Sequence, residues 1–183
     1  RCKMGDTGTN MVGTFKTIAA NLVSCRSANT LLKNIAGLSL EGARGNSGMI
    51  ISQYLNAIAR YASDKSTISL CQLGTILQKS VKDAYDAVET PREGTILTVM
   101  RVWATVIASE CAKGKNVGEV LHTALIAAQD ALKKTPEQLA VLKKYNVVDA
   151  GAWGFVSFLE GIVKLGEHGR VPFSKRNEFK SAA

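Results

Sequence analysis

Proline, histidine and aromatic residues are scarce in this sequence, and no long apolar run occurs. Only three of the 183 residues are proline, so most of the chain is free to form long, uninterrupted elements. Hydrophobic residues make up 46% and charged residues 21%, a composition that excludes disordered, collagen-like and low-complexity chains. No apolar stretch approaches the roughly 18 residues that a membrane span needs. The length fits one large domain.

The four cysteines, Cys2, Cys25, Cys71 and Cys111, are too widely spaced to form a C-x-x-C pair. A structural zinc site needs four soft ligands, usually in close pairs, and only two histidines accompany these cysteines. The sequence therefore argues against zinc. We expect four reduced thiols, mostly packed as small hydrophobic side chains, in a cytoplasmic protein.

Lysine and arginine outnumber aspartate and glutamate by 23 to 15, which gives a net charge of +8. Most of the excess lies in residues 1–63, as single residues spread over several turns. A nucleic-acid binder more often combines a dense basic stripe with aromatic residues for stacking. We therefore expect no nucleic-acid partner, because an anionic small ligand or an acidic protein surface fits the charge at least as well.

Hydrophobic residues recur at helical spacing through almost the whole chain, and no alternating strand pattern is present. Residues 95–112 are apolar nearly all round, which predicts a central, buried helix. We predict an all-α domain of about seven or eight helices. The predicted helices are a first one from near Met11 to Leu22, a second from Leu31 that ends at Gly37, then 49–62, 70–88, 95–112 and 117–132, a short one from Thr135, and 152–165.

Glycines lie at four of the predicted helix joints, each time beside Asp, Asn, Ser or Thr. Such loops expose backbone N–H groups, and the helices that follow present the positive ends of their dipoles. Four joints of this kind predict loops that converge on an anionic ligand. The four segments are Gly5-Asp6-Thr7-Gly8-Thr9-Asn10, Gly42-Ala43-Arg44-Gly45-Asn46-Ser47-Gly48, Glu93-Gly94-Thr95 and Val147-Val148-Asp149-Ala150-Gly151.

The first segment has a chemical and a purely structural interpretation. Asp6 is a hard oxygen ligand, suited to Mg²⁺ that is shared with a phosphate. Thr7, Thr9 and Asn10 could donate hydrogen bonds to phosphate, or they could cap the helix that begins near Met11.

The other three segments are equally open when taken singly. In the second, small residues would let the backbone approach a phosphate, and Asn46 and Ser47 would add donors before a helix that opens at Met49. Thr95 and Asp149 are either helix caps or polar groups that face a nucleotide.

Taken together, the motifs GDTGTNM, GARGNSG, P-x-EGTILTV and TPEQL…VLKKYNVVDAGAWG are specific. Their order resembles the nucleotide-binding domain of the fatty acid kinase A family, which is related to the L subunit of dihydroxyacetone kinase. The resemblance covers nearly all of residues 4–165. It implies a barrel of about eight antiparallel helices that binds ATP at one end, with phosphates at helix N-termini and Mg²⁺ ions held by aspartates.

The resemblance also implies an activity, a kinase that transfers the γ-phosphoryl group of ATP to a fatty acid carboxylate held on a DegV-type partner. The dihydroxyacetone kinase branch phosphorylates a small ketose instead. This sequence has Thr7 where that branch usually has histidine, and Asp149-Ala150-Gly151 where it usually has Asp-Pro-Gly. Both differences favour the fatty acid kinase side.

Residue by residue, Asp6 matches the second aspartate of the family's D-G-D metal motif. Asn10 matches the family asparagine, and the loop from Gly45 to Gly48 matches its phosphate loop. The site expected from the resemblance has Asp6 as the catalytic metal ligand, and its nucleotide-binding residues are Thr7, Thr9, Asn10, Gly45, Asn46, Ser47, Gly48, Thr95, Asp149 and Gly151.

Met4 departs from this pattern, because it stands where the family has the first aspartate of the metal motif. Thioether sulfur is a poor ligand for Mg²⁺, so the change should weaken metal binding and slow phosphoryl transfer. A second hypothesis follows, a catalytically weak nucleotide-binding module that acts through protein contacts. We expect an ATP-binding domain over residues 1–165, without the family's first helix, and a polar tail or linker over 166–183.

Overall fold

The computed structural model describes the backbone of residues 4–167 and the side chains of residues 10–165. Within these residues the only regular elements are helices and no strand is present, which confirms the predicted all-α class. The elements are α1 (Met4–Asn21), α2 (Ala28–Gly42), α3 (Gly45–Tyr61), α4 (Leu70–Asp86), α5 (Ile96–Glu110), the 3₁₀ turn η1 (Cys111–Lys113), α6 (Val117–Lys133), α7 (Thr135–Gln138), α8 (Ala140–Tyr145) and α9 (Ala150–Glu167).

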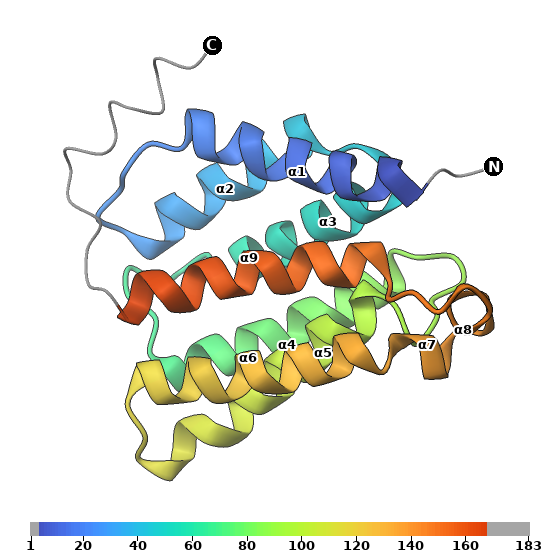
Figure 1. The fold of residues 1–183 in the computed structure, drawn as a ribbon. Helices are drawn as coiled ribbons and strands as arrows, with labels where there is room; N and C mark the ends of the chain where they lie inside the picture. The colour runs from blue at the N-terminus through green and yellow to red at the C-terminus, as the bar shows by residue number, and fades with distance from the viewer. Residues whose placement is uncertain (1–3, 168–183) are drawn as a thin grey trace.

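The seven long helices form a closed ring. Consecutive helices from α1 to α6 pack side by side, α6 packs against α9, and α9 packs back against α1. Figure 1 shows α9 crossing the molecule between the α1–α2 pair and the α4–α5–α6 group. Further contacts of α1 with α3, and of α5 with α9, fill the inside of the ring.

One neighbouring pair in this ring is parallel, and the pair is α1 with α9. Met11 of α1 lies against Gly154 of α9, and one turn later Phe15 stacks on Phe158 with ring centroids 4.4 Å apart. Both helices therefore advance in the same direction. A closed ring of an odd number of helices cannot alternate throughout, so one parallel pair is required.

The core occupies the inside of the ring, and α5 is its most buried element. Only a narrow polar strip of α5 reaches solvent, which agrees with the buried helix predicted over residues 95–112. The buried side chains of α5 pack against those of α3, α4, α6 and α9. They are Ile96, Leu97, Val99, Met100, Trp103, Ala104 and Ile107.

Three of the predicted helix boundaries are wrong. The third helix begins at Gly45, not at Met49, so Asn46 and Ser47 lie in its first turn and not in a loop before it. The second helix does not end at Gly37 but continues to Gly42, because small buried residues on its inner face pack closely on α3; the Ser39 hydroxyl, for example, lies 3.1 Å from that of Ser52. The first helix begins at Met4, not near Met11, so the GDTGTN motif is helical and does not form a loop. The described residues include no helix that is both long and apolar enough to cross a membrane.

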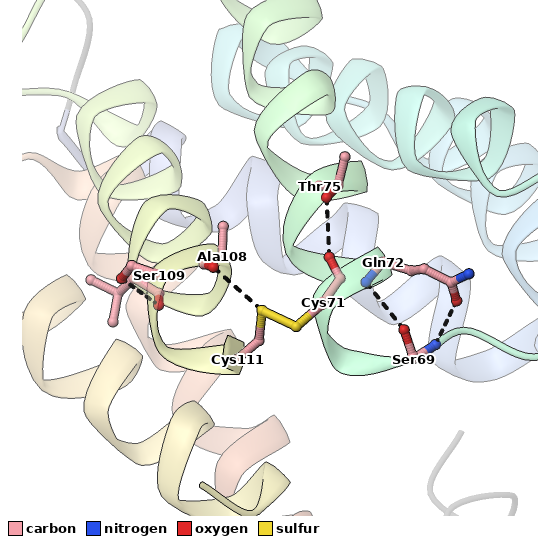
Figure 2. Close-up of a disulfide and its surroundings, with 8 residues drawn as sticks. Ser69, Cys71, Gln72, Thr75, Ala108, Ser109 and Cys111 are labelled. Atoms are coloured by element: carbon pink, nitrogen blue, oxygen red, sulfur yellow. Dashed lines mark hydrogen bonds between the residues drawn. A yellow bond between two sulfur atoms is a disulfide. The ribbon is translucent and has the colours of Figure 1, made fainter. Parts of the chain in front are cut away.

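The expectation of four reduced thiols is also wrong, because Cys71 and Cys111 form a disulfide (Figure 2). Cys71 lies in the first turn of α4 and Cys111 directly follows α5. Since the two helices are antiparallel neighbours, these ends meet and the Cα atoms are 5.3 Å apart. A separation of 40 residues in sequence gave no sign of this proximity. Cys25 is a free thiol, and Cys2 lies outside the described residues.

Near the disulfide, α4 and α5 approach so closely that their contact requires a glycine. A Cβ atom on Gly74 would lie 2.7 Å from the Cα atom of Ala108 and 2.9 Å from its backbone nitrogen. Backbone atoms cannot move aside as a flexible side chain can. The Gly74–Ala108 contact therefore sets the spacing of the two helices.

We predict that Gly74→Ala lowers the free energy of unfolding by about 1–3 kcal/mol, the usual cost of overpacking a tight contact. Gly37→Ala is the control, because a Cβ atom there would meet no atom within 4 Å. This second change should raise the free energy of unfolding by about 0.5–1 kcal/mol, since alanine favours an exposed helix interior. Urea denaturation of both variants tests the pair, and equal effects would contradict the packing described.

Candidate functional site

The helices α1, α3, α5 and α9 all begin at one end of the ring (Figure 1). A Cβ atom on Gly151, at the start of α9, would lie 2.8 Å from the Ser47 hydroxyl of α3 and 3.5 Å from the Cβ atom of Ile96 of α5. The Asn10 amide of α1 lies directly against Gly45 at the start of α3. The fold thus brings three of the four predicted segments together with Asn10 of the remaining one.

The start of α3 lacks the usual side-chain cap. Arg44 is the N-cap residue but its side chain makes no capping hydrogen bond, and the first turn holds no acidic residue. The Arg44 guanidinium instead donates to the carbonyl oxygens of Glu41 and Ala43, at 3.2 and 2.8 Å. Arg44 therefore supports its own loop, and none of the described side chains accepts a hydrogen bond from the first N–H groups of α3.

Glycine is required at the beginning of this turn. Gly45 has a φ of +59°, a left-handed conformation that residues with a Cβ rarely adopt. A Cβ atom here would also overlap the Asn10 amide. Gly45 and Asn46 are exposed and Ser47 is half-buried, so the polar edge of this turn faces solvent.

Below this turn, α1 packs against the loop between α2 and α3. The hydroxyl of Thr14, which is fully buried, lies 3.2 Å from the Asn10 carbonyl oxygen and 3.1 Å from that of Gly42 and can donate to either. A Cβ atom on Gly48 would lie 3.0 Å from the same hydroxyl. Thr14 was not among the predicted site residues, because a threonine inside an amphipathic helix has no signal of its own.

The start of α9 differs from that of α3, because Asp149 caps it. The Asp149 carboxylate accepts a hydrogen bond from the Ala152 N–H at 2.8 Å. The backbone N–H groups of Ile96 and Gly151 also face this carboxylate and lower its pKa. One carboxylate therefore joins the first turns of α5 and α9.

Burial raises the pKa of Asp149, and the three backbone hydrogen bonds offset this only in part. The Asp149 N–H in turn donates to the hydroxyl of Thr135, at 3.1 Å, which fixes the backbone ahead of the helix. Asp149 thus fills the structural role foreseen for it as a cap.

Thr95 stands at the N-cap position of α5, but its side chain does not cap the helix. Its hydroxyl donates to the carbonyl oxygen of Arg92 at 2.7 Å. Thr95 is half-buried and lies next to Ile96, which the Asp149 carboxylate holds. Its backbone is therefore fixed at the same end of the ring.

The predicted residues Asp6, Thr7 and Thr9 lie in the first turns of α1, but their side chains are outside the described ones. Among the side chains of residues 10–165, no three His, Cys, Asp or Glu residues gather in a way that could hold a metal ion. The Asp149 carboxylate lies at these helix starts and already accepts the Ala152 N–H.

Two surface grooves lie between neighbouring long helices. One, of about 380 Å³, runs between α4 and α5 and includes Tyr85, Glu93 and Arg101. The other, of about 340 Å³, runs between α3 and α4 and includes Arg60 and Asp83. Sequence reasoning missed both, since each combines residues from two helices.

The model of the DAK2 domain family matches residues 5–164 of the chain. An uncharacterised protein of Mycoplasma pneumoniae is 36% identical over 170 residues, which cover 88% of this chain and 30% of the relative. Uncharacterised proteins of Staphylococcus aureus and Staphylococcus haemolyticus are 36% and 37% identical, each over 87% of this chain and about 30% of their own length. The chain thus spans about a third of the length of these curated relatives.

The raised pKa of Asp149 predicts a pH dependence of stability. Because its folded pKa lies above the unfolded value of about 3.9, the folded state binds the proton more tightly. The contribution of Asp149 to the free energy of unfolding should therefore decline as pH rises from about 4 through the folded pKa.

Asp149→Asn removes this titration and keeps a residue that caps helices well. Urea denaturation gives the free energy of unfolding of the parent and of the variant at each pH. We expect the difference, parent minus variant, to decrease as the pH is raised from 4 to 7. A difference that rises over this range would show that the hydrogen bonds outweigh burial.

Proposed function

The chain belongs to the DAK2 domain family, and from this premise we propose that it is the ATP-binding domain of a fatty-acid-kinase-like phosphotransferase. A DAK2 domain is a kinase-related domain, which makes nucleotide binding its expected property. The observation that carries the proposal is the start of α3, where glycine-rich backbone has no side-chain cap and lies beside the Asn10 amide.

The phosphates of ATP suit this turn for a simple physical reason. The first N–H groups of a helix have no partner inside the helix, and its N-terminus carries roughly half a positive charge. The first turn of α3 holds no acidic residue, and no side chain of residues 10–165 caps it, so none of these competes for the N–H groups. We assign the phosphates to the backbone of Gly45 to Gly48, with side-chain donors from Asn10, Asn46 and Ser47.

The remaining predicted residues complete the proposed site from neighbouring helices. Thr95 and Gly151 would border the nucleotide, and Asp149 would hold the starts of α5 and α9 in place while it caps α9. Thr7 and Thr9, in the first turns of α1, would add hydroxyl donors. These assignments stay proposals.

Magnesium belongs to the proposal through Asp6. Mg²⁺ commonly binds to one or two carboxylates together with substrate phosphates and water. A single aspartate beside a phosphate-binding turn is compatible with that set of donors. The bound magnesium ion would neutralise negative charge on the phosphates. Met4 supplies no second carboxylate, so we expect the ion to be held weakly.

In the proposed reaction a carboxylate oxygen of a fatty acid attacks the γ-phosphorus atom of ATP. The bond between this phosphorus and the bridging oxygen breaks, and ADP leaves with that oxygen. The products are an acyl phosphate and ADP. Phosphoryl transfer needs positioning and charge neutralisation more than a protein nucleophile, which suits a site built from backbone N–H groups and a metal ligand.

We assign the acyl chain to a separate DegV-type carrier protein, as the fatty acid kinase resemblance implies. Thr7 and the Asp149-Ala150-Gly151 sequence support this branch over a ketose kinase. Met4 supports a second candidate, a nucleotide-binding module with weak or no catalysis that acts through protein contacts.

The nucleotide proposal predicts that Mg-ATP raises the melting temperature. At an ATP concentration 100 times Kd the added stability is about 2.7 kcal/mol. Asn46→Asp should weaken this binding about tenfold or more, because the new carboxylate repels phosphate. The same change should leave the ligand-free protein equally or slightly more stable, since a negative charge favours a helix start.

Gln72→Glu is the matched control for Asn46→Asp. It also changes an exposed amide to an acid, in the first turn of α4, and Gln72 already belongs to a capping box there. This variant should bind Mg-ATP like the parent. The proposed site would be contradicted if Mg-ATP did not raise the melting temperature of the parent. It would also be contradicted if Mg-ATP raised the melting temperatures of both variants equally.

Two further variants in the same assay separate the two candidate functions. Asp6→Ala should remove the dependence of binding on Mg²⁺, and Met4→Asp should strengthen it. Turnover of ATP with an acyl-loaded carrier would support the kinase, whereas binding without turnover would support the module. An unchanged magnesium dependence in both variants would contradict the metal assignment.

A further inference from the structure

The Glu93 carboxylate accepts three hydrogen bonds just ahead of α5. Its Oε1 atom accepts from the Tyr85 hydroxyl at 2.9 Å. Its Oε2 atom accepts from the Thr98 hydroxyl at 2.6 Å and from the Arg101 guanidinium at 2.7 Å. The donors come from α4 and from the first two turns of α5, so the carboxylate ties the segment between these helices to both of them.

Thr98 passes this restraint on to the backbone. Its hydroxyl donates to Glu93 and at the same time accepts from the Gly94 N–H at 2.9 Å. Gly94 has a φ of +78°, and a Cβ atom on it would lie 2.9 Å from the carbonyl oxygen of Thr135. On one side the Gly94 backbone is therefore held by a hydrogen-bond relay, from Gly94 through the Thr98 hydroxyl to Glu93. On the other side it is enclosed by α7.

On the far side lies Asp149, whose carboxylate faces the Ile96 N–H and, like the Ile96 side chain, lies against Gly151. Glu93 and Asp149 thus bracket Thr95, one through Gly94 and one through Ile96. This is the part of α5 that lies against Gly151 and, through it, against Ser47 of α3. A shift of Gly94 would be transmitted to the helix starts at which we place the nucleotide.

Stability alone is a weak explanation for this cluster. The side chains of Glu93 and Arg101 are about half exposed, at 49% and 50%, and exposed ion pairs contribute little to stability. Although burial raises the pKa of Glu93, the hydrogen bonds from Thr98, Arg101 and Tyr85 lower it overall. The carboxylate is kept ionised and oriented.

We propose that Glu93 is a positioning residue for the nucleotide site, and that it acts through Thr98 and Gly94 to set the position of Thr95 and the start of α5. The inference rests on the proposed function. Tyr85 and Arg101 hold the carboxylate in place from the α4/α5 groove.

The chain offers a matched comparison in a second cluster of the same residue types. Asp83 accepts hydrogen bonds from the Arg60 guanidinium and, at 3.2 Å, from the Tyr61 hydroxyl. It too joins an acid, an arginine and a tyrosine across neighbouring helices, here α3 and α4. No hydrogen bond in this cluster reaches the Gly94 segment, so its loss should cost stability without moving the helix starts.

The test measures the Mg-ATP dissociation constant and the melting temperature of the full chain for Glu93→Gln and Asp83→Asn. We expect Glu93→Gln to raise Kd about fivefold to tenfold, the size of one lost charge-assisted hydrogen bond. We expect the Kd of Asp83→Asn to stay within about twofold of the parent value, although its melting temperature should fall about as much as that of Glu93→Gln.

Thr98 provides a check that a structural role would not reproduce. Thr98→Val keeps the shape but removes the relay, and it should raise Kd as Glu93→Gln does. Thr98→Ser keeps the hydroxyl and should restore binding to the parent value.

The two levels of the proposal fail in different ways. A parent that does not bind Mg-ATP would overturn the proposed function and this inference with it. A parent that binds Mg-ATP, with Glu93→Gln no weaker than Asp83→Asn or Thr98→Ser no better than Thr98→Val, would overturn the positioning role alone.

Discussion

The constraint on which this structure depends is that its ring of seven long helices cannot alternate in direction throughout. One neighbouring pair must be parallel, and the contacts of Met11 with Gly154 and of Phe15 with Phe158 show that it is α1 with α9. The parallel pair places two helix starts side by side. Together with α3 and α5, it gathers four helix N-termini at one end of the molecule (Figure 1).

Four positive helix ends would repel one another unless something negative lay among them. Asp149 supplies one negative charge and joins α5 to α9 through their backbone N–H groups. The start of α3 receives no such group from the side chains that the structure describes, since its N-cap side chain makes no capping hydrogen bond and its first turn holds no acidic residue. The fold thus neutralises one part of this end with its own carboxylate and leaves another part open to an anion from outside, which the phosphates of ATP would supply.

The sequence was sufficient to predict the seven long helices, because hydrophobic spacing is a local signal, but the short helix α8 was missed. It was misleading where packing overrides such signals. Gly37 looks like a helix stop but lies inside α2, since the buried Ser39 packs on α3. Cys71 and Cys111 are far apart in sequence, and only the antiparallel pairing of α4 and α5 shows that they form a disulfide.

The candidate site was predictable to a similar degree. The motifs identified Gly45, Ser47, Asp149 and Gly151, which the fold brings to one end. They did not show which helix starts are already capped, because a cap depends on side-chain geometry. The Glu93 network was equally hidden, since its partners come from two helices and have no common spacing.

The most direct test of the central claim is amide hydrogen exchange, residue by residue, with and without Mg-ATP. If the open start of α3 binds the phosphates, the N–H groups of Asn46, Ser47 and Gly48 should exchange more slowly with the ligand. Protection should be smaller at Gly151 and Ala152, near the start of α9 that Asp149 already caps. Binding of Mg-ATP with no change at α3, and with protection confined to the groove between α4 and α5, would contradict the account.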